Sequence, residues 1–207
     1  MQFRTYTGGI FDTNCYYIEN GARSILIDAP QGSADWLKAK GLPVALLLLT
    51  HGHIDHVTDA AQVKREHGCP VGYHPDGIRM LTEKNFLRNF GFDFEVDRVV
   101  ADFPVTETES KQFEGIEFQV LEVPGHCPGS VCFFSKADRL LFGGDVLFAG
   151  GVGRWDLPGG DRDLLFSGIK NKVLPLGDDV TVLSGHGPPT TIGRERRTNP
   201  FLTGEVG

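Results

Sequence analysis

The sequence concentrates metal-binding residue types in one short segment that follows a run of apolar residues. After the apolar run 44–49 and one threonine come His51, His53, Asp55 and His56, in the spacing H-x-H-x-D-H. Chance is a poor explanation, because the His and Asp content of the chain predicts about 6 × 10⁻⁴ such matches. Imidazole suits zinc and iron, and a carboxylate can bridge two cations. We therefore interpret this segment as the centre of a metal site.

Three further candidate ligands follow apolar runs elsewhere in the chain. His126 comes after the run 120–123, Asp145 after 140–142 and His186 after 180–183. In α/β folds, ligand sites gather outside the carboxyl ends of strands. A glycine directly precedes each of the three residues and lets the backbone turn sharply beside the site. We expect all of these side chains to converge.

The spacing of the candidates divides them between two metal ions. Residues two apart in an extended loop point to the same side, so the first two histidines of the motif can reach one ion together. The first ion is then assigned His51, His53 and His126, the second Asp55, His56 and His186, and Asp145 bridges both. Two metals about 3.5–4 Å apart share a water and lower its pKa towards neutrality. We expect two divalent ions, zinc first with iron or manganese as alternatives, and we name Asp55, His56 and Asp145 as the catalytic residues.

Four other residues are weaker candidates for the site. His67 ends a predicted helix, where a structural role is expected, and His74 is expected at the surface or behind the ligands. Arg154 and Asp156 follow Asp145 on a glycine-rich loop. They either brace that loop as an ion pair, or Arg154 contacts a carboxylate of the substrate.

Composition and charge narrow the classes of function. The chain has 207 residues, 20 Lys and Arg against 27 Asp and Glu, and a net charge of −7. This balance argues against nucleic acid and anionic membrane surfaces as partners. The start of the chain lacks a basic-then-apolar signal sequence, and no apolar run approaches the ~20 residues of a membrane span. We expect a cytoplasmic protein whose four cysteines are reduced thiols.

The elements that must position these residues are short strands interleaved with helices. Ser33 is the expected N-cap of its helix, and Gly41 and Gly68 are expected helix stops. This alternation predicts an α/β (α+β) mixed sheet system covered by helices, in one domain over 1–207. The predicted strands are 15–18, 24–27, 44–49, 116–123, 131–134, 139–142 and 180–183, and the predicted helices are 33–40, 58–67, 77–90 and 161–172.

The motifs together resemble the metallo-β-lactamase-fold hydrolases, and within them the small single-domain bacterial glyoxalase II-like proteins. The metal ligands carry part of this resemblance. The rest comes from the stretches 12–16, 126–130, 143–148, 153–161 and 184–193, followed by Glu195, Arg196, Asn199 and Pro200. The similarity covers nearly the whole chain.

The resemblance implies a four-layer αββα sandwich with the metals at one edge. It also implies hydrolysis of a small-molecule glutathione thioester such as S-lactoylglutathione, by a metal-bridging hydroxide. The chain ends at Gly207 without the C-terminal helical region through which larger glyoxalase II enzymes hold glutathione, so we expect weak glutathione binding. Cys127 stands where the family commonly has Thr, and Trp155 where smaller residues are usual.

Two alternatives to a thioester hydrolase stay open at this point. A mononuclear iron persulfide dioxygenase of the same fold would use only His51, His126 and Asp145. Another hydrolase of the fold would act on a lactone or a phosphoester. β-Lactam hydrolysis and RNA processing are less favoured, the first because the pattern of Asp55 and Asp145 resembles the glyoxalase side of the family, the second because the chain is acidic.

Overall fold

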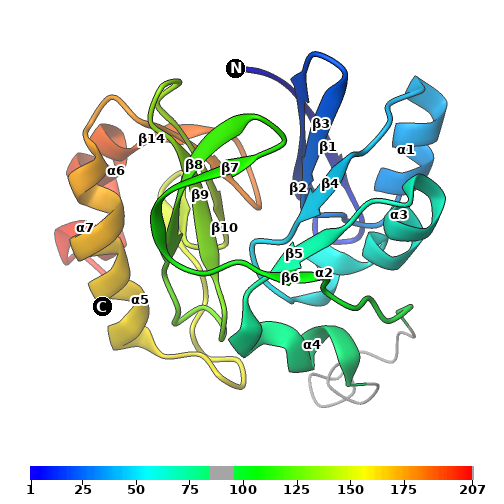
Figure 1. Ribbon diagram of the computed structural model, residues 1–207. Coiled ribbons are helices and arrows are strands. Elements are labelled where there is room, and N and C mark those ends of the chain that lie inside the picture. Colours follow the sequence, from blue (N-terminus) through cyan, green and yellow to red (C-terminus); the bar gives the residue numbers. More distant parts are fainter. Residues whose placement is uncertain (84–95, 207) are drawn as a thin grey trace.

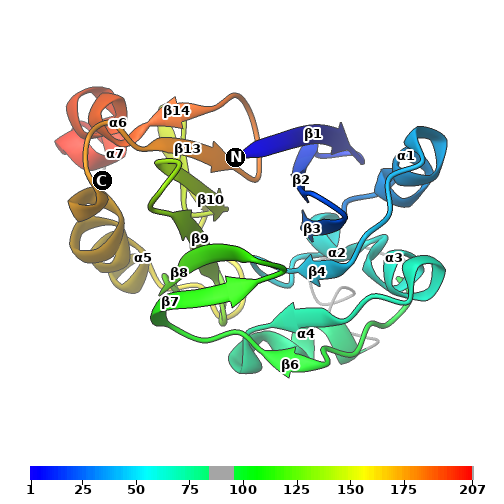
Figure 2. The ribbon, with the colours of Figure 1, turned by 45° about the horizontal axis from the view of Figure 1, so that its top comes forward.

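The computed structural model of the protein describes residues 1–83 and 96–206 (Figure 1). It consists of two six-stranded sheets that lie face to face, with helices on both outer sides (Figure 2). Half of the predicted helix 77–90, including Phe86 and Phe90, lies outside the described residues; in the described half, α4 covers Ile78–Thr82.

The first sheet is built by the N-terminal half of the chain in the order β1 to β6. The first three strands are antiparallel, and β3 to β6 run parallel. The parallel strands β4 and β5 are buried and apolar, as expected for strands covered on both faces. The strands are β1 (Gln2–Gly8), β2 (Thr13–Asn20), β3 (Arg23–Ile27), β4 (Leu46–Leu48), β5 (Val71–Tyr73) and β6 (Phe103–Pro104).

The second sheet has the order β14-β13-β10-β9-β8-β7, and a separate two-stranded ribbon lies beside it. Its strands are antiparallel except for β10 and β13. The strands are β7 (Thr108–Phe113), β8 (Ile116–Glu122), β9 (Val131–Ser135), β10 (Leu140–Gly144), β13 (Thr181–Ser184) and β14 (Thr190–Thr191), and the ribbon is β11 (Leu147–Phe148) with β12 (Gly151–Val152).

Helices flank the pair of sheets on its two outer sides, so that α1 and α3 lie at one side and α5 to α7 at the other (Figure 1). Those of the first half are α1 (Ser33–Lys40), α2 (Ile54–Val57), α3 (Ala60–His67), the 3₁₀ turn η1 (Pro75–Gly77) and α4 (Ile78–Thr82). Those of the second half are α5 (Arg162–Gly168), the π-helical η3 (Ile169–Val173), the 3₁₀ turn η4 (Leu174–Leu176), α6 (Ile192–Thr198) and α7 (Pro200–Thr203).

Alternation along the strands divides the apolar residues among three buried layers. In β3, Ile25 and Ile27 join the core between the sheets, whereas Leu26 faces the core under α1 and α3. In the same way Phe133 of β9 lies between the sheets, and Phe134 joins the core under α5. Three cores separate four layers, which confirms the predicted αββα sandwich.

Several predicted boundaries shift for local reasons. Ser33 is wrong as an N-cap: Gly32 precedes the helix with a φ of 87°, and Ser33 is already helical. The helix predicted over 58–67 begins two residues later, as α3, because Asp59 departs from the helical path and separates α3 from the short helix α2 before it. The helix predicted from 161 begins one residue later, because the Asp161 side chain caps it by accepting a hydrogen bond from the Leu164 amide at 3.0 Å.

The four cysteines are buried free thiols, in agreement with the prediction of reduced residues. In the described part of the chain, no helix combines the length and the apolar character that crossing a membrane requires.

Candidate metal centre

The seven predicted ligands lie together at one edge of the sandwich, where strands of both sheets end. His51 and His53 follow β4, and Asp55 and His56 lie on α2. The other three, His126, Asp145 and His186, follow β8, β10 and β13 of the second sheet. The Asn14 amide, in β2, donates to the carbonyl of Gly185 at 2.7 Å, and a β-bridge pairs Thr13 with His186. These two contacts join the sheets beside the site.

The first group of donors consists of three histidines. The Nδ1 atom of His53 lies 2.7 Å from Nε2 of His126. The ring centroid of His51 lies 4.9 Å from the ring centroid of His53 and 4.8 Å from that of His126. One donor atom of each histidine lies within 4.8 Å of the others. Three imidazoles at such distances could hold one metal ion.

The second group contains one donor atom each from Asp55, His56 and His186, again within 4.8 Å of one another. Nε2 of His186 lies 3.2 Å from the Asp55 carboxylate, and Nε2 of His56 lies 3.6 Å from it. The second carboxylate of the ligand set, that of Asp145, lies between the two groups. Asp145 is 3.2 Å from His56, 3.4 Å from His186 and 3.5 Å from His126.

This arrangement fits metal ions by two criteria. Two donors at about 2.1 Å from a tetrahedral ion lie about 3.4 Å apart, close to the separations around Asp145. In addition, the Nε2 atoms of His51 and His56 and the Oδ1 atom of Asp145 are buried without a hydrogen-bond partner. Buried polar atoms almost always have a partner. Polar atoms that converge without one are the arrangement that a bound cation satisfies.

Outward-facing hydrogen bonds fix the orientation of the histidines. A carbonyl or carboxylate oxygen can only accept, so three of the rings donate their Nδ1–H to such an oxygen and turn Nε2 inwards. His56 donates to Asp28 at 2.8 Å, His126 to the Arg154 carbonyl at 2.7 Å and His186 to the Phe11 carbonyl at 2.9 Å. The inward Nε2 atoms are thereby the ones that face a metal.

Asp28 is the residue that sequence reasoning missed. Its buried carboxylate accepts hydrogen bonds from the Thr50 amide at 2.8 Å and the Thr50 hydroxyl at 2.7 Å, besides the bond from His56. The Thr50 hydroxyl in turn lies 3.1 Å from Nδ1 of His51. One carboxylate therefore braces histidines of both groups. A signal was present, because Asp28 directly follows an apolar strand, as the ligands do.

Charges of opposite sign share the centre and shift one another's pKa. Burial opposes a charge on His186, but hydrogen bonds to Asp145 and Asp55 raise its pKa to about 10. Burial also opposes a charge on Asp55, yet the nearby His56 and the bond from His186 lower its pKa to about 2. Burial lowers the pKa of His53 to about 3, with His126 acting in the same direction. The carboxylates thus stay ionised, and in the absence of a metal their charge holds protons on neighbouring imidazoles.

Position 185 requires glycine because side chains of the site lie very close to its Cα atom. A Cβ atom there would lie 2.2 Å from Oδ1 of Asp145 and 2.5 Å from Cε1 of His56. Such contacts are far below any van der Waals separation, so only glycine lets the loop after β13 pass this close to the donors.

The remaining candidates take other positions. The Arg154 guanidinium, 59% exposed, forms an ion pair with Asp156 at 2.8 Å, and only the backbone of Arg154 reaches the site. His74 is buried and lies 2.9 Å from Glu122, while His67 accepts a hydrogen bond from the Val44 amide.

The thiol of Cys127 lies within 4.8 Å of donors of the first group and 3.3 Å from the Ser130 hydroxyl. Burial raises the pKa of this thiol to about 11, although Ser130 acts in the opposite direction. Cys127 is therefore a neutral thiol near pH 7.

The fold and the histidine-rich edge define a metallo-hydrolase of the αββα class. The family model of the metallo-beta-lactamase superfamily matches residues 8–186, and the chain belongs to this superfamily.

Among curated proteins, the chain is 39% identical to hydroxyacylglutathione hydrolase GloC of Haemophilus influenzae, over 93% of both chains. It is 34% identical to the probable metallo-hydrolase YqgX of Bacillus subtilis, over 99% of both.

Two solved structures are similar in fold and sequence. BLEG-1, described as a B3 metallo-beta-lactamase, has a TM-score of 0.90 and 37% identity, over 98% of this chain and all of that one. TTHA1623, in a di-iron-bound form, has a TM-score of 0.84 and 37% identity, over 96% of this chain and all of that one. The ETHE1 protein of Myxococcus xanthus, 24% identical with a TM-score of 0.79, shares the fold.

Proposed function

We propose that the protein is a dinuclear thioester hydrolase that cleaves a 2-hydroxyacyl thioester of the S-lactoylglutathione type. The observation that carries this proposal is the position of Asp145. Its carboxylate lies within 3.5 Å of His126 in the first donor group and of His56 and His186 in the second. A mononuclear site would need neither the second group nor a carboxylate shared between the two.

The donor groups assign the ligands. In this proposal His51, His53 and His126 hold the first ion, Asp55, His56 and His186 hold the second, and Asp145 contacts both. When bound, two divalent ions supply Lewis acidity that activates water and polarises an acyl carbonyl. The similarity to a di-iron protein and to GloC supports two ions and a thioester, respectively.

The side chains around the centre hold this set in place. Asp28 fixes the tautomer of His56, and the Arg154 carbonyl does the same for His126. Thr13 donates its hydroxyl proton to Asp55 at 2.7 Å and orients that carboxylate. A thiolate is a good leaving group, so the cleavage requires no side chain that protonates it.

The test is the variant His186→Ala, with His67→Ala as a control histidine outside the centre. Without His186 the second ion loses an imidazole, and the hydrolysis rate of S-lactoylglutathione should fall by about 10² or more. Elemental analysis should show fewer than two ions per chain. If the variant keeps its metal content and consumes oxygen with glutathione persulfide, the site is a mononuclear iron dioxygenase and the proposal is wrong.

β-Lactam hydrolysis is the second candidate, because a protein 37% identical to this chain is described as a B3 metallo-beta-lactamase. The same metal-loaded preparation should be assayed with nitrocefin. Ring opening that is faster than thioester cleavage, and lost in His186→Ala, would assign that activity instead.

A further inference from the structure

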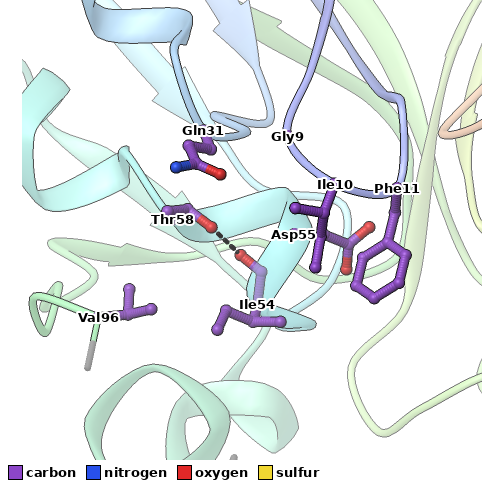
Figure 3. A pocket seen from close by; sticks show the side chains of 8 residues that line it. All are labelled: Gly9, Ile10, Phe11, Gln31, Ile54, Asp55, Thr58 and Val96. Atoms are coloured by element: carbon purple, nitrogen blue, oxygen red, sulfur yellow. Dashed lines mark hydrogen bonds between the residues drawn. The ribbon is translucent and has the colours of Figure 1, made fainter. Parts of the chain in front are cut away.

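A cavity of about 260 Å³ opens beside the metal centre (Figure 3). It lies between the turn that joins β1 to β2, the start of α2 and the residues just after the undescribed segment. Its lining consists of Gly9, Ile10, Phe11, Gln31, Ile54, Asp55, Thr58 and Val96. Asp55 belongs to the donor set, so a molecule in this cavity adjoins the reacting bond. An engineered cavity of about 150 Å³ already holds benzene, so the space here suffices for an aromatic or branched group.

Among the described lining residues, Asp55 is the one charged side chain, and four of the others are apolar. Ile10, Phe11, Ile54 and Val96 supply hydrocarbon surface, and none of the eight described lining residues is a lysine or an arginine. The Thr58 hydroxyl is already engaged, because it donates to the Ile54 carbonyl at 2.6 Å. Glutathione carries two carboxylates, and the described part of the lining offers them no cation. Arg154 is not among the lining residues, and its guanidinium is paired with Asp156.

The apolar wall is held in place by the metal centre itself. The Phe11 carbonyl accepts the hydrogen bond from His186. Thr13, two residues after Phe11 in the chain, pairs with His186 in a β-bridge. The backbone of the turn is thereby fixed while its side chains stand outwards: Ile10 is 66% exposed and Phe11 43% exposed. Exposed large apolar side chains next to a reactive site mark a binding surface.

We propose that this cavity binds an apolar, uncharged arm of the substrate, with Ile10 and Phe11 as the residues that select it. This inference rests on the proposed thioester hydrolysis and names its substrate class: a thioester in which the thiol or the acyl part is apolar. The glutathione arm of a substrate does not itself occupy this cavity.

The experiment compares three thioesters on the metal-loaded enzyme. The S-lactoyl ester of benzyl mercaptan carries an apolar thiol arm, phenylacetyl-glutathione an apolar acyl arm, and S-lactoylglutathione neither. One of the first two thioesters should be hydrolysed with the highest kcat/KM. The identity of that substrate shows whether the cavity holds the thiol arm or the acyl arm. In Phe11→Ala, the kcat/KM of this preferred apolar-arm substrate, divided by the kcat/KM of S-lactoylglutathione, should fall about tenfold. The fall should come from a higher KM for the apolar-arm substrate. The control Leu164→Ala, an exposed apolar residue of α5 outside the cavity, should leave the ratio unchanged.

A second variant reverses the selection. Ile10→Arg places a cation at the exposed edge of the cavity, so KM for S-lactoylglutathione should fall while KM for the apolar substrate rises. If S-lactoylglutathione is the best substrate of the wild type and neither variant changes the ratio, the apolar subsite is refuted and the hydrolase assignment stands.

A binding measurement separates the two proposals. The uncharged dye N-phenyl-1-naphthylamine should bind the wild type with increased fluorescence, and Phe11→Ala and Ile10→Arg should weaken it about tenfold. If this holds but no thioester is cleaved, the proposed function fails and the apolar site survives. Equal dye binding by all variants would refute the site.

Discussion

The substitution Asp28→Asn tests whether a carboxylate behind the ligands controls the metal centre. Asp28 is 2% exposed and accepts three hydrogen bonds, two from Thr50 and one from His56. Asparagine has the same shape but replaces one oxygen with an NH₂ group. In either orientation this group faces a donor: the Thr50 amide if it replaces Oδ1, or the Thr50 hydroxyl and the His56 ring if it replaces Oδ2.

The magnitude follows from these contacts. A hydrogen bond to a charged group is worth about 1.5–3 kcal/mol, so losing at least one of the three, together with the charge that strengthens the others, should destabilise the metal-free protein by about 2 kcal/mol or more. The negative charge behind His56 is lost in both orientations, which makes its ring a weaker metal ligand, and where the NH₂ group faces the ring His56 must also take the tautomer with a proton on the nitrogen that faces the metals. Substitutions of this kind typically cost about 10–100-fold in metal affinity. The second ion, which we assign to His56, should weaken by that factor.

The assay is a chelator competition titration of metal-free protein, with urea unfolding measured in parallel. Asp35→Asn is the matched control, since Asp35 is an exposed aspartate of α1 far from the ligands in the chain. It should change neither quantity. The reasoning is refuted if Asp28→Asn folds with wild-type stability and binds both ions with wild-type affinity.

Three further predictions concern the glycine, the thiols and a helix cap. Gly185→Ala should reduce metal content and activity strongly because its Cβ collides with Asp145, whereas Gly187→Ala, where no atom lies within 4 Å, should cost only the strain of a φ of 72°. Burial raises the pKa of the Cys69 thiol to about 11. The native protein should therefore resist alkylation by iodoacetamide at pH 8 and react faster as the pH rises towards 11. Rapid alkylation of Cys69 at pH 8, detected by mass spectrometry, would contradict this. Asp161→Ala should lower the free energy of unfolding by about 1 kcal/mol through loss of the α5 cap, and Asp163→Ala, exposed in the same helix, should not; equal urea midpoints would count against the cap.

The fold could be predicted where local patterns decide the structure. Gly41 and Gly68 end α1 and α3 with φ of 64° and 63°, as their positions after the helical patterns suggested. The strands β1 and β7 were missed because both carry mostly exposed or half-buried polar residues, and hydrophobic periodicity gives no signal there.

The candidate site likewise has a part that the sequence predicts and a part that it does not. The donors could be predicted, since imidazole and carboxylate after a strand are visible as residue types. The contacts that orient them could not, because the carbonyls of Phe11 and Arg154 act through the backbone, which any residue supplies. The pairing of Thr13 with His186 is likewise a long-range register that no local pattern encodes.

The central claim, that two metal ions act together in hydrolysis, is tested most directly by titrating metal-free protein with metal while measuring thioester cleavage. The structure has two donor groups that share Asp145. We predict that activity with S-lactoylglutathione, and with the better of the two apolar-arm thioesters, rises until two ions per chain are bound. Full activity at one ion per chain, with no further gain from a second, would contradict the account.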